Sequence, residues 1–368
     1  MRRIEGRLPL GAGAFEGVRL EIEGVHIVAV ERLPMADPGL PIVSSGWIDL
    51  QCNGALGHDF SDPEADFDEV PSFLARNGVT GYLATVITAA PESYPAVLAR
   101  LRDLSAIPGS RFLGIHLEGP FLSPGHRGAH NPGWLMHPDR AKVELLAVEP
   151  VRMVTLAPEL DGALEAISRL REMGVVPSAG HSGATYEEAR DAFAAGLGAG
   201  THLFNAMPPL HHREPGLAGA LLESASPPSG LIADGIHLHP AMVRLAWRAR
   251  GPDGLFPVTD AVPAVGLPPG EYSLSGQRIW VDVETARMED GRLAGSLLTM
   301  DRAIANLAAW TGDLAGVLRA ASETPARILG LSKRRGRLVP GLDADLVLFD
   351  DGLNVLETIV GGRTVHRR

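Results

Sequence analysis

The feature that most constrains the fold is an alternation of short apolar runs with helix-like segments in the middle of the chain. The two clearest helical segments are GALEAISRLREMG and TYEEARDAFAAG, whose apolar residues recur at helical spacing. Eight apolar runs have the character of buried strands: GWIDLQ, TGYLATVIT, FLGIHLEG, VRMVTLAPE, VVPSAGH, AGTHLFN, GLIADG and LFPVTDA. Eight strand and helix alternations predict an α/β fold, a parallel (β/α)8 barrel of the TIM type.

The two ends of the chain have a different pattern. Residues 1–45 alternate apolar and polar positions, as in GVRLEIEGVHIVAVE, which is the period of half-exposed strands. Residues 336–368 contain short apolar runs separated by Gly and Asp. We therefore expect both ends to pair into one small β domain, with the barrel at residues 46–335. The Pro- and Gly-rich stretches AMPPLHHREPG and AVPAVGLPPGEY are expected to be loops over the barrel mouth.

Composition narrows the class of partner. The formal charge of -11 opposes a nucleic-acid role, because phosphate backbones are bound through a surplus of Lys and Arg. The single cysteine, Cys52, leaves no internal disulfide framework and fits a reducing compartment. Its thiol is either a nucleophile or inert packing in an apolar strand. The N-terminus has no continuous apolar run, so we expect no signal peptide and no membrane span, and a soluble cytoplasmic protein.

Polar residues stand at the ends of most of the predicted barrel strands. In such a barrel the C-terminal strand ends face the active-site mouth. A single residue of this kind is often a hydrogen-bonded packing or capping residue, but five at matching positions indicate a functional site. The five residues are Glu118, His181, His202, His237 and Asp260.

Three of these residues form the set that a catalytic zinc ion prefers. Glu118, His181 and His202 supply one carboxylate and two imidazoles, which leaves a coordination position for water. We expect one divalent metal per subunit, Zn2+ in the first place, although Fe2+ or another first-row ion also fits these ligands. Asp260 is then the expected general base, taking a proton from the attacking water and giving it to a leaving amine. Its alternative role is to cap the segment that follows the last strand.

Three further side chains remain open from the residues alone. His130 lies on the loop after the third strand and could donate a hydrogen bond to a carbonyl oxygen. His116 precedes Glu118 by two residues, so strand geometry does not exclude it as a metal ligand. Arg213 suits a phosphate or carboxylate group, but a solvated surface charge is an equal alternative.

Several long motifs resemble one family in the same order along the chain. They resemble the N-acetylglucosamine-6-phosphate deacetylases of the amidohydrolase superfamily over about residues 46–335, and the terminal segments resemble the small β-sandwich domain of such enzymes. The motifs are GIHLEGPFLSPGHRGAHNP, AGHSGATYEEA, THLFNAMPPLHHREPGLAGALL, LIADGIHLHP, PVTDAVPAVG and LAGSLLTMDRAIANL.

The resemblance implies roles for particular positions. Glu118, His181 and His202 match the metal ligands, Asp260 the catalytic base, and His130 a residue near the acetyl carbonyl. Further matches imply substrate contacts: Asn205 and Ala206 through their backbone, Arg213 and His237 to the phosphate, and Leu298, Thr299 and Met300 beside the acyl group. In such enzymes the arginine can come from the neighbouring subunit, which implies a homodimer.

The implied reaction is hydrolysis of the N-acetyl amide of a small, 6-phosphorylated amino sugar. N-acetylglucosamine 6-phosphate is the first expectation. The alternatives are N-acetylgalactosamine 6-phosphate, another amide substrate of the same superfamily, and an inactive sugar-phosphate binder.

This sequence differs from the two-metal members of the superfamily at the end of the first barrel strand, GWIDLQCNG. Two-metal members of the superfamily carry two histidines where this sequence has Gln51 and Asn53. An amide oxygen replaces an imidazole poorly on an ion such as zinc. We therefore expect a single tightly bound metal, with Gln51 and Asn53 hydrogen-bonded to water or neighbouring side chains, or acting as simple polar core residues.

Overall fold

The computed structural model describes residues 1–11, 13–34 and 36–368; Ala12 and Met35, inside the predicted 1–45 segment, lie outside the described residues. Eight parallel strands form one sheet in the order β14-β13-β12-β11-β10-β9-β8-β5. Each lies within or overlaps one predicted run, so the predicted barrel is confirmed. The strands are β5 (Trp47–Cys52), β8 (Val79–Ile87), β9 (Arg111–Glu118), β10 (Val151–Leu156), β11 (Val176–Ala179), β12 (Ala199–Gly200), β13 (Ser229–Leu231) and β14 (Leu255–Pro257).

The barrel is closed by the segment that follows β14. Cys52 at the end of β5 forms a parallel bridge with Ala261. The Asp260 amide donates to the Gln51 carbonyl at 2.8 Å, and the Asn53 amide donates to the Ala261 carbonyl at 2.8 Å. This closure joins the first barrel strand to the segment after the last one, and it places Asp260 beside the end of β5.

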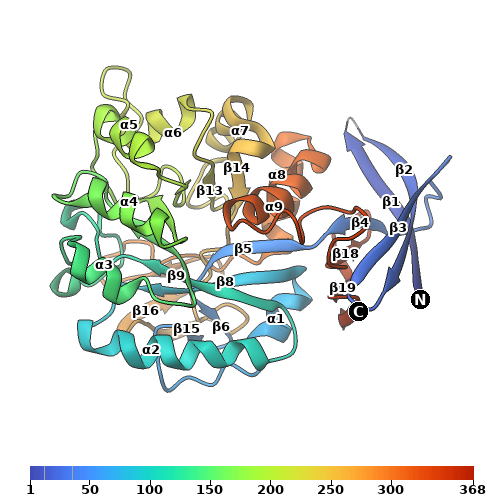
Figure 1. The fold of residues 1–368 in the computed structure, drawn as a ribbon, viewed down its shortest axis with the longest axis horizontal. Helices are drawn as coiled ribbons and strands as arrows, with labels where there is room; N and C mark the ends of the chain where they lie inside the picture. Colours follow the sequence, from blue (N-terminus) through green and yellow to red (C-terminus); the bar gives the residue numbers. More distant parts are fainter. Residues whose placement is uncertain (12, 35) are drawn as a thin grey trace.

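Helices cover the outside of the barrel (Figure 1). Helix α4 buries Ala163, Ala166, Ile167 and Leu170, which recur at helical spacing. Helix α5 begins with a capping box between Thr185 and Glu188. The α-helices are α1 (Val70–Arg76), α2 (Tyr94–Leu101), α3 (Arg140–Leu146), α4 (Ala163–Glu172), α5 (Tyr186–Ala195), α6 (Gly216–Glu223), α7 (Pro240–Gly254), α8 (Met300–Thr311) and α9 (Leu314–Ile328). Short 3-10 turns are η1 (Pro91–Ser93), η2 (Arg102–Ala106), η3 (Pro124–His126) and η4 (Pro132–Trp134).

Both chain ends build a separate sheet beside the barrel (Figure 1). Its strands are β1 (Arg2–Gly11), β2 (Ala14–Glu23), β3 (His26–Leu33), β4 (Ile42–Ser45), β18 (Leu346–Phe349), β19 (Val355–Val360) and β20 (Arg363–Arg367). Antiparallel pairing of β18 with β4 joins the two ends, and the sheet has its own apolar cluster. We propose residues 1–45 and 336–368 as one domain and 46–335 as the other, because β4 and β5 belong to different sheets.

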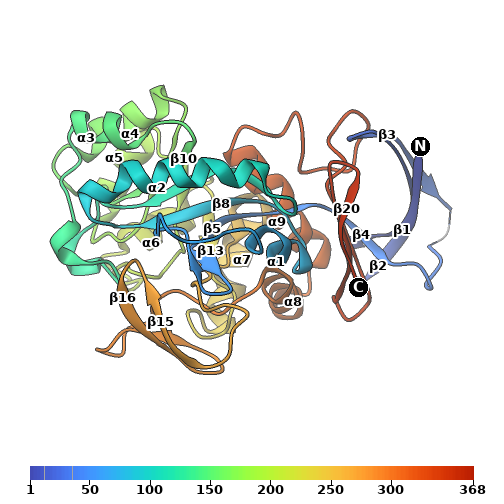
Figure 2. The ribbon, with the colours of Figure 1, turned by 90° about the horizontal axis from the view of Figure 1, so that it is seen from below.

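Two small insertions lie near the barrel mouth. One is a hairpin of β6 (Gly54–Ala55) and β7 (His58–Asp59). The other is a three-stranded sheet of β15 (Gly270–Leu274), β16 (Gln277–Val281) and β17 (Ala286–Arg287). Figure 2 shows β15 and β16 as an orange hairpin on the side of the barrel away from the terminal sheet. The stretch at 261–272 was expected to be a loop throughout, but its last three residues belong to β15.

Among the residues that the structure describes, no helix has both the length and the apolarity that crossing a bilayer requires.

Candidate active site

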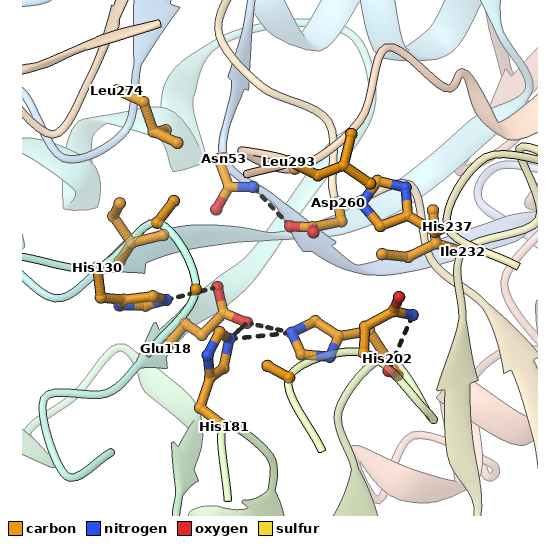
Figure 3. A pocket seen from close by; sticks show the side chains of 16 residues that line it. Asn53, Glu118, His130, His181, His202, Ile232, His237, Asp260, Leu274 and Leu293 are labelled. Carbon is orange, nitrogen blue, oxygen red and sulfur yellow. Dashed lines mark hydrogen bonds and ion pairs between the residues drawn. The ribbon is translucent and has the colours of Figure 1, made fainter. Parts of the chain in front are cut away.

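Four of the predicted residues meet at the C-terminal ends of the barrel strands. Glu118 is the last residue of β9, while His181, His202 and Asp260 closely follow β11, β12 and β14. All four are buried, and their side chains line the pocket drawn in Figure 3. The last three have left-handed backbone, with φ of 51°, 28° and 49°. Strained backbone of this kind persists where the surrounding fold enforces it, and it often occurs at functional sites.

Three ligand atoms of this group converge on one point. The Nε2 atoms of His181 and His202 are 3.0 Å apart, and they lie 3.2 and 3.0 Å from Oε1 of Glu118. Nδ1 of His181 donates to the His126 carbonyl at 2.9 Å, so in neutral His181 the Nε2 lone pair points at the other two atoms. A lone pair facing a carboxylate oxygen at this distance is repulsive unless a cation or proton lies between them. The donor set therefore fits a divalent metal ion.

The electrostatics of these three groups agree with that geometry. Burial would raise the pKa of Glu118, but the imidazoles of His130, His181 and His202 around it hold that pKa well below its usual range. Burial lowers the pKa of His181 to about 4, so its ring is neutral. Burial alone would lower the pKa of His202, but the hydrogen bond and charge of Glu118 outweigh it and raise that pKa. An ionised carboxylate next to a neutral imidazole is the form in which such groups bind metals.

The other side of the site contains amides instead of imidazoles. Nε2 of Gln51 donates to Oε1 of Glu118 at 2.7 Å and to Oδ1 of Asp260 at 3.2 Å. Nδ2 of Asn53 donates to the same Asp260 oxygen at 2.8 Å, as Figure 3 shows. Burial, together with the negative charge of Glu118, raises the pKa of Asp260 to about 6. The two amides thus fix one oxygen of a carboxyl group that is able to exchange a proton near neutral pH.

His130 reaches the site from the long loop after β9. The Thr88 amide donates to its Nδ1 at 3.2 Å, so in the neutral ring the proton is on Nε2. That Nε2 lies 3.6 Å from Oε2 of Glu118 and borders the cavity. His130 is therefore placed to donate a hydrogen bond into the site.

Two side chains that the sequence left open lie outside this arrangement. Both ring nitrogens of His116 have protein partners, the Leu50 carbonyl at 2.9 Å and Thr155 Oγ1 at 2.8 Å. Burial lowers the pKa of His116 to about 4, so it is a neutral core histidine. Cys52 is fully buried and burial raises the pKa of its thiol, which favours a packing role over a nucleophilic one.

The expected substrate-contact residues are divided between the cavity and other places. His237, Asn205 and Ala206 line the cavity, and Nδ1 of His237 donates to Asp234 at 2.6 Å. Arg213 is exposed, contacts His212, and does not line this cavity in the described chain.

The segment predicted to lie beside the acyl group is also outside the cavity. Leu298, Thr299 and Met300 line a separate small cavity near the start of α8, whereas Leu293 and Gly295 border the site instead.

Two supporting residues were not identified from the sequence. The Asp49 carboxylate, in β5, accepts a hydrogen bond from the Thr259 hydroxyl at 2.6 Å. This bond stabilises the junction between β5 and the segment that follows β14, which we call the closing seam. A carboxylate inside an apolar strand was a signal that could have indicated this role. Leu274, on the β15–β16 hairpin, lines the cavity although nothing in the local sequence marks it.

Glu118, His130, His181, His202 and Asp260 all border one cavity at the barrel mouth. It combines a candidate metal centre, a carboxyl group with a raised pKa and a histidine donor. Such an arrangement can activate water and stabilise charge on a carbonyl oxygen, which is the chemistry of amide hydrolysis.

Comparison with known proteins agrees with this chemistry. Residues 72–365 match the model of the amidohydrolase family. The chain is 42% identical to the N-acetylglucosamine-6-phosphate deacetylase of Danio rerio, over 89% of this chain and 85% of that protein. It is 36% identical to the N-acetylgalactosamine-6-phosphate deacetylase of Escherichia coli O157:H7, over 97% of each. It also matches a mutant N-acetyl-D-glucosamine-6-phosphate deacetylase of Mycobacterium smegmatis, solved in complex with N-acetyl-D-glucosamine-6-phosphate, with a TM-score of 0.91, 36% identity, and coverage of 99% and 98%.

Proposed function

The chain belongs to the amidohydrolase family, and on that premise we propose that it hydrolyses N-acetylglucosamine 6-phosphate to acetate and glucosamine 6-phosphate. The observation that carries the proposal is the convergence of three ligand atoms beside Asp260 in one cavity, in a chain similar over most of its length to such deacetylases.

We propose that Glu118, His181 and His202 hold one divalent metal ion, in the first place Zn2+. When bound, the ion supplies Lewis acidity, which polarises the amide carbonyl and lowers the pKa of the attacking water. Fe2+ or another first-row ion fits the same ligands.

Asp260 is the proton carrier in this proposal. Its Oδ1 is occupied by the side chains of Gln51 and Asn53, which leaves Oδ2 to accept a proton from water as the water oxygen bonds to the amide carbon. The same proton then passes to the nitrogen as the carbon–nitrogen bond breaks. Nε2 of His130 donates a hydrogen bond to the carbonyl oxygen while negative charge develops there.

The phosphate end of the substrate would be held by His237 and Arg213. His237 is fixed by Asp234 at the rim of the cavity. Because Arg213 is exposed and outside the cavity, we propose that it serves the site of a neighbouring subunit in a homodimer. The lone cysteine fits a cytoplasmic location for such an enzyme.

The test is acetate release from a panel of three substrates. We expect fast release from N-acetylglucosamine 6-phosphate and slow release from unphosphorylated N-acetylglucosamine, because the phosphate contacts position the amide. The third substrate is N-acetylgalactosamine 6-phosphate, which the similarity to the Escherichia coli protein makes the second candidate. Preference for that epimer would replace the first proposal, and no acetate from any of the three would contradict both.

A further inference from the structure

The cavity has two unlike ends on either side of the reacting groups. Figure 3 shows His237 at the right of the pocket and Leu274 at its upper left, with Glu118, His181 and His202 lower in the view. At the His237 end the imidazole is the polar group, and Figure 3 shows Ile232 and Leu293 beside it. The opposite end is apolar, with Leu274 from the β15–β16 hairpin and Ile87 from the end of β8, which pairs with Glu118 in the barrel sheet.

The proposed reaction fixes the direction in which the substrate crosses this cavity. The phosphate binds at the His237 end, and the amide carbon must lie beside the metal ligands and Asp260. A secondary amide is planar and trans, so its acyl chain extends on the side away from the sugar carbon. The acyl chain therefore points from the reacting groups toward the apolar end.

We propose that Leu274 sets the length of the acyl group that this enzyme can remove, restricting it to acetyl and shorter groups. This inference rests on the proposed function, since it uses the phosphate end to orient the substrate. It gives the β15–β16 hairpin a role in substrate choice, in addition to covering the mouth.

Leu274 is held too firmly to move aside for a longer acyl chain. Its side chain is 2% exposed. The next residue, Ser275, donates its amide to Oδ2 of Asp59 at 2.6 Å, on the neighbouring β6–β7 hairpin. Further along, Nε2 of Gln277 donates to the Ala129 carbonyl at 2.7 Å, directly before His130. These contacts fasten the tip of the hairpin to two other segments of the mouth.

Ser275 and Gly276 both have positive φ, 48° and 72°, so the tip is a tight turn. A tight, fastened turn leaves Leu274 little freedom. Because an excess methylene in a rigid apolar pocket costs about 10- to 200-fold in specificity, each added carbon should be strongly disfavoured.

The experiment compares N-acetyl, N-propionyl and N-butyryl glucosamine 6-phosphate in the wild-type enzyme and in Leu274→Ala. We expect the kcat/KM ratio of butyryl to acetyl substrate to rise at least about 10-fold in the variant. The matched control is Ile279→Ala, on the same hairpin and fully buried but not lining the cavity, which should leave the ratio unchanged.

A second variant acts in the opposite direction and covers a failure of the first to fold. Leu274→Phe narrows the apolar end, so the ratio of kcat/KM for the N-acetyl substrate to kcat/KM for the N-formyl substrate should fall about 10-fold. Unchanged ratios in the Leu274 variants, or an equal rise in Ile279→Ala, would overturn the assignment of Leu274. A wild-type enzyme that releases no acetate from N-acetylglucosamine 6-phosphate would instead contradict the proposed function itself.

Discussion

The two sides of the active site differ in the kind of atom that they direct inward. The ligand side is formed by Glu118, His181 and His202. Its three ligand atoms, Oε1 of Glu118 and Nε2 of each histidine, lie 3.0 to 3.2 Å from one another. The amide side, formed by Gln51, Asn53 and Asp260, pairs N–H donors with a carboxylate. Acceptors that face one another need a cation between them, whereas donors paired with an acceptor are already satisfied.

The difference supports the proposal that this barrel works with one metal ion. Gln51 links the two sides, since its Nε2 donates to Glu118 and to Asp260. Donor hydrogens thus occupy the space in which a second cation would meet these carboxylates. In the proposed mechanism the chemistry is divided accordingly: the ligand side would hold the ion, and the amide side would position Asp260, the proposed proton carrier.

The largest effect is expected from breaking the ligand side. His202→Ala removes one of three ligand atoms and should abolish nearly all turnover, with metal affinity at least about 100-fold weaker, because loss of an outer-sphere partner alone costs 10- to 100-fold. Metal content after gel filtration measures this directly. Asn53→Ala is the matched control on the amide side and should retain its metal; equal loss in both variants would remove the distinction between the two sides.

The next largest effect comes from the amide side. Asp260→Asn preserves shape, and its side-chain oxygen still accepts from Gln51 and Asn53, but it cannot take a proton. We expect turnover to fall by about 10²- to 10⁴-fold with an unchanged fold and metal content. Acetate release and elemental analysis of the same sample test this, and near wild-type turnover by the metal-loaded variant would refute the role of Asp260.

A residue that belongs to neither side gives a smaller and more selective effect. Arg213→Ala should raise KM for N-acetylglucosamine 6-phosphate by about 10- to 150-fold, corresponding to a charged hydrogen bond of 1.5–3 kcal/mol. Unphosphorylated N-acetylglucosamine and the metal content should be nearly unaffected. If KM rises equally for both substrates, Arg213 does not bind the phosphate.

The last expected effect is on stability and not on turnover, and it concerns the junction between β5 and the segment after β14, which supports the amide side. Burial raises the pKa of Asp49 from its reference value of 3.8 to about 7. Because the folded-state pKa is the higher one, the stabilising contribution of Asp49 is complete below about pH 4 and is lost as the pH rises through 7. Asp49→Asn has no such titration, so its free energy of unfolding relative to the wild type should increase between pH 4 and pH 8. Denaturant unfolding at both pH values measures it; a constant difference would contradict the raised pKa.

The sequence predicted those parts of the fold that depend on local pattern. The strand ends at Glu118, His181, His202 and Asp260 could be located because apolar runs end there and parallel strands present their C-terminal ends on one face. The terminal strands were likewise recognisable from their alternation. Asparagine and glutamine at the end of β5 could be noticed, but their shared contact with Asp260 arises only when the barrel closes.

The remainder of the site depends on contacts between distant segments. Whether His116 binds a metal could not be decided from strand spacing, because the answer lies in its partners Leu50 and Thr155. Leu274 reaches the cavity through a hairpin whose position is fixed by Asp59 and Ala129, far away in sequence. The position of Leu298–Met300 behind the seam is similarly a result of packing at the start of α8.

The most direct test of the difference between the two sides is a metal titration. Metal-stripped enzyme is reloaded stepwise with Zn2+ while bound metal and acetate release are followed in parallel, and the double variant Gln51→His with Asn53→His serves as a control designed to accept a second ion. We predict that wild-type activity reaches its maximum at about one tightly bound equivalent per chain, the number that one set of two imidazoles and a carboxylate accommodates. Activity that continues to rise until two equivalents are tightly bound would contradict the one-metal account.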